Sequence, residues 1–143
     1  EYEKYGWKHC EVFSGVKEML QELKAAGKRL AVATSKPIKF TNMIVKGFDL
    51  EKYFDVVGGA SSDASKEAKC DVINDVLCRL DVNDKSKVLM VGDRMYDIDG
   101  AHICGIDVCA VLYGYGNKKE FEEHRTEHIV KTPSDVVNLV LKR

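Results

Sequence analysis

The sequence lacks the features of a membrane-spanning, secreted or nucleic-acid-binding protein. No apolar run approaches the length of a transmembrane helix, and no secretory signal pattern opens the chain. Neither sign of charge is in excess, since 22 Lys and Arg residues stand against 23 Asp and Glu residues and leave a net charge of −1. This balance argues against a general nucleic-acid or membrane-surface partner.

Paired cysteines are also lacking. The five cysteines (Cys10, Cys70, Cys78, Cys104 and Cys109) are odd in number and form no C-x-x-C pair. We therefore predict reduced, mostly buried side chains that behave as small apolar residues, and a cytoplasmic location. The first residue is Glu1 rather than Met, which indicates that the chain does not begin at a natural translation start.

What is present is the pattern of one α/β domain. Its 143 residues are 45% apolar and 31% charged, as in ordinary globular domains. Strand patterns alternate with helix patterns along the whole chain. The strands are expected at 29–34, 55–59, 87–92, 107–114 and, more weakly, 128–132; the helices at 14–27, 37–47, 66–80, from 93 to about 101, and from 132 onward. This alternation predicts a parallel sheet with helices on both faces.

Polar and small residues gather where the predicted strands end. The segment VLMVGDRMYDIDGA runs from a buried strand into Asp93, Asp97 and Asp99. Carboxylates require water, a cation or hydrogen-bond donors, so this strand is expected to end in a site. An earlier predicted strand ends at Thr34 and Ser35, and a later one ends at the GYG segment. In parallel sheets, ligands bind beyond these carboxyl ends.

Each motif also has a purely structural interpretation. Asp93 could cap the following helix and Asp97 could be solvated, Thr34 could serve a helix start, and Lys69 could be an ordinary surface lysine. The segment HRTEH at 124–128 fits the H-x-x-E-H zinc-peptidase pattern, but that pattern requires a helix. Ile129 and Val130 favour a strand there, so we interpret HRTEH as unrelated to zinc.

Order and spacing connect these motifs to a known family. The segments GVKEMLQELKAAGKRLAVATSKP, YFDVVGGASSDASKEAKCDVI, VLMVGDRMYDIDGA and VLYGYG resemble the haloacid dehalogenase-like hydrolases, and among them the phosphoglycolate phosphatase-like branch. The resemblance runs from about Phe13 to the C-terminus. It implies a Rossmann-like three-layer α/β/α core with a mainly parallel sheet.

The resemblance also implies roles for individual residues. Thr34 matches the strand-end hydroxyl that binds the phosphoryl group, with Ser35 beside it, and Lys69 matches the lysine that balances charge on the nucleophile and the phosphate. Asp93 matches the direct ligand of Mg²⁺ and Asp97 the supporting one. These types suit the chemistry, because phosphoryl transfer needs its negative charge neutralised and Mg²⁺ prefers oxygen ligands.

One part of the family pattern is missing from the printed sequence. The family's nucleophile is the first aspartate of a D-x-D-G-T motif on the first strand, and the DIDG at 97–100 falls inside a predicted helix instead. We therefore expect residues 1–13 to be a remnant of the cap domain and its linker, and residues 14–143 to be an incomplete core that lacks the first strand and the cap. In the family that strand lies between the strand ending at Thr34 and the strand ending at Asp93. Those two strands should then pair directly or leave a gap.

These observations favour the core of a magnesium-dependent phosphatase acting on a small phosphorylated metabolite through an aspartyl-phosphate, with the 143-residue chain itself inactive. The alternatives are a phosphomutase of the same superfamily and a non-catalytic remnant that binds a partner or ligand. Because the cap largely selects the substrate in this family, phosphoglycolate, nucleoside monophosphates and pyrophosphate all stay open. No nucleic-acid or membrane partner is expected, and the sequence carries no signal for the oligomeric state.

Overall fold

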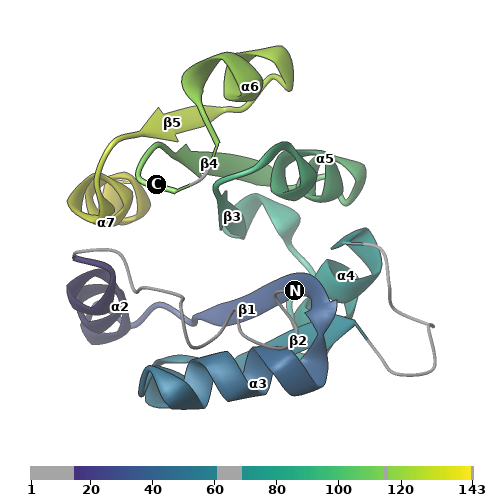
Figure 1. The fold of residues 1–143 in the computed structure, drawn as a ribbon, viewed down its shortest axis with the longest axis vertical. Coiled ribbons are helices and arrows are strands. Elements are labelled where there is room, and N and C mark those ends of the chain that lie inside the picture. Colours follow the sequence, from purple (N-terminus) through teal and green to yellow (C-terminus); the bar gives the residue numbers. More distant parts are fainter. Residues whose placement is uncertain (1–14, 61–68, 115, 143) are drawn as a thin grey trace.

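Helices and strands alternate along the chain in a computed structural model, which describes residues 15–60, 69–114 and 116–142 (Figure 1). The elements are α2 (Val16–Ala25), β1 (Ala31–Pro37), α3 (Ile38–Gly47), β2 (Val56–Ala60), α4 (Lys69–Arg79), β3 (Leu89–Gly92), α5 (Met95–Ile103), β4 (Asp107–Val111), α6 (Lys118–Glu123), β5 (His128–Val130) and α7 (Pro133–Lys142). Short 3₁₀ turns occupy Glu51–Tyr53 and Lys85–Lys87. The predicted α/β class is confirmed. None of the described helices is long and apolar enough to cross a membrane.

The strands form two separate parallel sheets. β1 pairs with β2, whereas β3, β4 and β5 form a second sheet with β4 in its centre. In Figure 1 the first sheet and α3 lie in the lower half, and the second sheet lies above it. The sequence analysis predicted that β1 and β3 either pair directly or leave a gap. Within the described ranges the two strands are not hydrogen-bonded neighbours, so they do not pair directly.

β3 is exposed in a way that an inner strand of a parallel sheet is not. Val91 on β3 is 36% exposed, whereas Val108, Cys109 and Ala110 on the neighbouring β4 are 0% exposed. Inner strands of such sheets are normally covered on both faces. Among the described strands β3 stands at the edge of its sheet, and a further strand between β3 and β1 stays a prediction.

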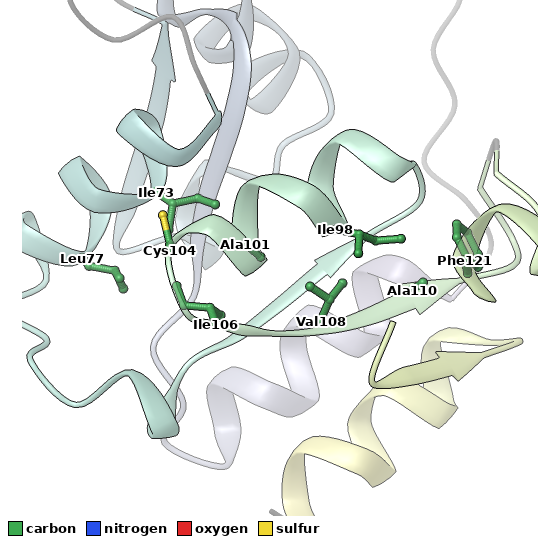
Figure 2. Packing of buried hydrophobic residues seen from close by; sticks show 9 residues of the cluster. All are labelled: Ile73, Leu77, Ile98, Ala101, Cys104, Ile106, Val108, Ala110 and Phe121. Carbon is green, nitrogen blue, oxygen red and sulfur yellow. The ribbon is translucent and has the colours of Figure 1, made fainter. Parts of the chain in front are cut away.

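β4 separates two apolar layers, which gives the three-layer core. Its side chains alternate between the two faces, as the period of a strand requires. Val108 and Ala110 pack against α4, α5 and α6 in the cluster of Figure 2, which comprises Ile73, Leu77, Ile98, Ala101, Cys104, Ile106, Val108, Ala110 and Phe121. Cys109 and Val111 face the other way, toward α2 and α7.

Several element boundaries differ from those predicted. β1 continues past Thr34 to Pro37, and α3 begins only at Ile38. The predicted cap Ser14 and the first residues of the predicted helix 66–80 lie outside the described residues, and the described part of that helix is α4. The sequence pattern did not reveal α6, because this helix is only 6 residues long and has one buried side chain, Phe121.

The cysteines are less uniformly buried than predicted. The four in the described ranges are free, with Cys104 and Cys109 buried, Cys70 half-buried and Cys78 exposed. Burial raises the pKa of the Cys109 thiol to about 11 and, together with the neighbouring Cys70, that of Cys104 to about 12. Both buried thiols therefore stay protonated at neutral pH.

Phe121 is expected to be the most sensitive side chain of α6. Its ring is 0% exposed within the cluster of Figure 2, so Phe121→Ala should lower the free energy of unfolding by about 3–5 kcal/mol through lost burial and a residual cavity. The control Glu122→Ala changes the exposed neighbour on the same helix and should stay within about 0.5 kcal/mol of wild type. Urea unfolding monitored by circular dichroism measures both. Similar losses in the two variants would contradict the packing of α6.

Candidate active site

The end of β3 leads into a turn that Asp97 closes. β3 ends at Gly92, Asp93 follows, and α5 begins at Met95. The Oδ2 atom of Asp97 accepts hydrogen bonds from the backbone N–H groups of Asp93 at 3.1 Å and Arg94 at 3.3 Å. The first N–H groups of a helix lack intrahelical acceptors, and a carboxylate is favoured there. Asp97 therefore determines the backbone path at Asp93.

Lys69 reaches the same carboxylate from another helix. Its Nζ lies 2.7 Å from Oδ1 of Asp97, and the two side chains are only 13% and 16% exposed. Gly100 makes this approach possible, because a Cβ atom at that position would collide with the stem of Lys69. The structure thus brings together Lys69, Asp93 and Asp97, which the sequence analysis proposed for one site.

The loop after β4 covers Asp93. A Cβ atom at Gly114 would collide with the Asp93 side chain, and one at Gly116 would collide with the Asp93 carbonyl oxygen. Gly114 and Gly116 of the GYG segment therefore lie beside Asp93, and Tyr115 between them lies outside the described residues. Burial, followed by the neighbouring Cys109 and the Asp93 charge, raises the pKa of Tyr113 to about 12. The Tyr113 hydroxyl consequently stays protonated and adds no charge next to Asp93.

Thr34 lies on β1, in the other sheet. It is half-buried in the middle of β1, and its hydroxyl oxygen accepts a hydrogen bond from the backbone N–H of Lys36 at 3.2 Å. Ala33 beside it packs against the cluster that includes α4 and α5. Ser35 belongs to β1, but its side chain lies outside the described residues. The phosphate-binding roles of Thr34 and Ser35 stay predictions.

The DIDG and HRTEH segments, which the sequence analysis set aside, adopt the predicted local structures. The DIDG segment at 97–100 lies inside α5 rather than at a strand end. In HRTEH, His124 follows the end of α6 and its Nδ1 lies 2.8 Å from Asp99, whereas His128 begins β5. The two histidines therefore do not share a helix.

The donor set around Asp93 suits Mg²⁺. It offers the carboxylates of Asp93 and Asp97. The described part of the chain contains no group of three or more His, Cys, Asp or Glu residues that could hold a metal. Mg²⁺ typically keeps several waters and binds one or two carboxylates together with substrate phosphate, so a third acidic residue is not required. Within this pair, Asp97 already accepts bonds from Lys69 and two backbone groups.

Sequence analysis missed Glu120, on α6. Its Oε2 accepts a hydrogen bond from the backbone N–H of Met95 at 2.7 Å and from Nε of Arg94 at 3.2 Å. The only sequence signal was the spacing of Asn117 and Glu120, which is typical of a residue that caps its own helix. That signal does not point to α5.

Comparison with known proteins agrees with this geometry. A family model described as "Haloacid dehalogenase-like hydrolase" matches residues 1–111, and the chain belongs to this family. It is 39% identical over 96% of its length to the tyrosine-protein kinase PtkA of Mycobacterium tuberculosis, and 30% identical over 99% to a phosphoglycolate phosphatase of Nitrosospira multiformis.

A solved structure shows the same fold. A crystal structure from Clostridium acetobutylicum, described as a predicted phosphatase, superposes with a TM-score of 0.91 over 99% of the chain at 33% identity. The chain spans only part of these proteins: 44% of PtkA, 62% of the Nitrosospira enzyme and 65% of the Clostridium protein.

Asp97 should matter more for stability than Asp99 on the same helix. Asp97→Ala leaves the mostly buried Lys69 ammonium and two backbone N–H groups without their acceptor, so the free energy of unfolding should fall by about 2–3 kcal/mol. Asp99 is 53% exposed and its side chain pairs with His124 near the surface, so Asp99→Ala should cost less than about 1 kcal/mol. Chemical denaturation of both variants at neutral pH provides the measurement. An equal loss would show that the Lys69–Asp97 pair does not organise the site.

Proposed function

We propose that the chain is the core of a magnesium-dependent phosphatase that hydrolyses a small phosphorylated metabolite. The observation that carries the proposal is the carboxylate of Asp97, which joins the turn at Asp93 to the Lys69 ammonium 2.7 Å away. A cation and two carboxylates thereby meet at the end of a parallel strand, where such folds bind ligands. Membership of the hydrolase family supports the same reaction class.

Each residue has a distinct part in this proposal. The Thr34 hydroxyl, with Ser35, binds oxygens of the phosphoryl group. Lys69 balances the negative charge of the nucleophile and the phosphate, and Asp97 keeps Lys69 and the Asp93 turn in their places. Asp93, supported by Asp97, would hold Mg²⁺. When bound, Mg²⁺ supplies positive charge that neutralises the phosphate oxygens during transfer.

The reaction proceeds in two balanced steps. A carboxylate oxygen of the family's nucleophilic aspartate forms a bond to phosphorus, while the bond from phosphorus to the substrate oxygen breaks and that oxygen takes up a proton from the solvent, to which the water of the second step returns one. Water then hydrolyses the aspartyl-phosphate, which restores the carboxylate and releases inorganic phosphate. The D-x-D-G-T motif that carries this aspartate is not in the printed sequence, and the space between β1 and β3 is where we place its strand.

The acceptor of the phosphoryl group separates the candidate functions. Water gives a phosphatase, a sugar hydroxyl gives a phosphomutase, and a protein tyrosine is a further candidate because the 39%-identical relative is a tyrosine-protein kinase. A non-catalytic remnant would bind a ligand and transfer nothing. Phosphoglycolate, nucleoside monophosphates and pyrophosphate are the proposed substrate classes, and free cysteines support a cytoplasmic setting.

The 143-residue chain by itself should not turn over phosphate monoesters. The reason is chemical, because the printed sequence supplies no strand-end aspartate in a D-x-D-G-T setting to accept the phosphoryl group. The assay is release of p-nitrophenol from p-nitrophenyl phosphate by the purified chain with Mg²⁺. Steady hydrolysis that Asp93→Asn abolishes would contradict the assignment of the nucleophile.

In the full-length protein, Asp93→Asn should lower kcat/KM for the same ester by at least about 100-fold. Asp99→Asn is the matched control, since Asp99 lies on the same helix but pairs with His124 away from Lys69, and its effect should be severalfold at most. Parallel reactions with a sugar phosphate or a tyrosine peptide as acceptor distinguish the mutase and kinase alternatives. Equal losses from the two substitutions would mean that the metal site is misplaced.

A further inference from the structure

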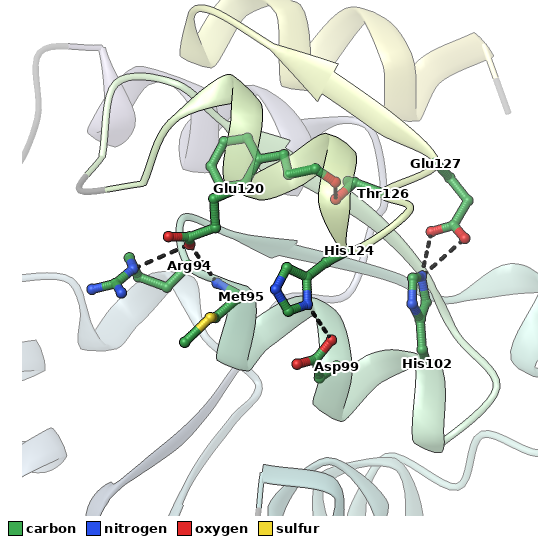
Figure 3. Close-up of polar contacts among 9 residues, drawn as sticks. Arg94, Met95, Asp99, His102, Glu120, His124, Thr126 and Glu127 are labelled. Carbon is green, nitrogen blue, oxygen red and sulfur yellow. Dashed lines mark hydrogen bonds and ion pairs between the residues drawn. The ribbon is translucent and has the colours of Figure 1, made fainter.

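The segment from α6 to β5 contacts α5 at three points along its length (Figure 3). Each contact joins a charged or titratable side chain of this segment to a residue at the start, middle or end of α5. The contacts are Glu120 with Arg94 and Met95, His124 with Asp99, and Glu127 with His102. The first of these differs from the others, because it reaches the backbone next to Asp93.

Glu120 satisfies a backbone group that α5 cannot satisfy itself. Met95 is the first residue of α5, so its N–H has no acceptor within the helix. Oε2 of Glu120 accepts this N–H at 2.7 Å and Nε of Arg94 at 3.2 Å, and the Glu120 side chain is only 18% exposed. A charge-assisted bond in such a poorly solvated position is stronger and more directional than one at the surface.

The direction of the Glu120 side chain is unusual for its position. Asn117 caps α6, and its Oδ1 accepts the backbone N–H of Glu120 at 2.9 Å. A glutamate at this position commonly turns back to the N–H of the capping residue. Here the carboxylate contacts the start of α5 instead, so it links two helices.

Carboxylates consequently bind three successive backbone N–H groups after β3. Asp97 accepts those of Asp93 and Arg94 from within α5, and Glu120 accepts that of Met95 from α6. Gly116, next to the capping Asn117, also lies against the carbonyl oxygen of Asp93. The turn that presents Asp93 is therefore held from its own helix and from the α6 segment.

We propose that Glu120 is a positioning residue for the magnesium site: it fixes the Asp93–Met95 turn so that the Asp93 carboxylate is oriented before the metal binds. The proposal rests on the proposed function. Groups that orient a ligand through a hydrogen bond commonly change metal affinity by about 10–100-fold when they are removed. In this proposal Glu120 acts through the backbone of the turn, where it accepts the Met95 N–H.

The test uses Glu120→Ala, Glu120→Gln and His124→Ala in the full-length protein. Glutamine keeps an oxygen that can accept the Met95 N–H, whereas alanine removes it. His124→Ala is the matched control, because it removes the contact with Asp99 farther along α5. Mg²⁺ affinity is measured by calorimetry without substrate, and exchange of the Met95 amide hydrogen is measured by NMR without metal.

We expect Glu120→Ala to weaken Mg²⁺ binding by about tenfold or more and to accelerate Met95 exchange, with Glu120→Gln intermediate. His124→Ala should leave the Mg²⁺ affinity within about twofold of wild type, even if it lowers the melting temperature as much as Glu120→Ala does. Unchanged Mg²⁺ affinity in Glu120→Ala, or an equal loss of affinity in His124→Ala, would refute the positioning role of Glu120 and leave the proposed metal site standing. Absence of Mg²⁺ binding by wild type would instead refute the metal site on which the proposal rests.

Discussion

The carboxylate of Asp97 connects the elements on which the site depends. One oxygen accepts backbone groups of the turn after β3, and the other pairs with Lys69 from α4. A carboxylate and an ammonium that are both mostly buried are stable only when each has a partner. Their mutual contact therefore helps to set the position of Asp93 relative to Lys69. Gly100 is needed because the stem of Lys69 leaves no room for a Cβ atom there, and Gly114 because the Asp93 side chain leaves none.

The division of the strands into two sheets distributes the residues proposed for the site. Thr34 stands on β1 in one sheet and Asp93 follows β3 in the other, while α4 packs against β1, β2 and α5. Lys69, at the first turn of α4, thus lies between the two sheets in the architecture. Among the described strands β3 pairs with β4, and a further central strand between β1 and β3 stays a prediction. A nucleophile on such a strand would lie between the residues proposed to bind phosphate and those proposed to bind Mg²⁺.

The parts of this arrangement that follow from local patterns could be predicted. A short apolar run before Asp93 indicated a strand that ends in a site, and Ile129 and Val130 indicated a strand after His124. Boundaries were less accurate where several outcomes were locally acceptable, as in the extension of β1 to Pro37. The helix α6 was missed because 6 residues with one buried side chain give almost no periodic signal.

The sequence by itself determined the family resemblance, the alternation of strands and helices, and the placement of Asp93 at the end of a strand, because each depends on residues close together in the chain. The tertiary structure alone decided which partners the carboxylates find. Asp97 meets Lys69 from a different helix, and Glu120 binds Met95, 25 positions earlier in the chain, instead of capping α6. A hydrogen bond requires its two atoms to come within about 3 Å, and only the packing of α4, α5 and α6 around β4 brings these distant segments together.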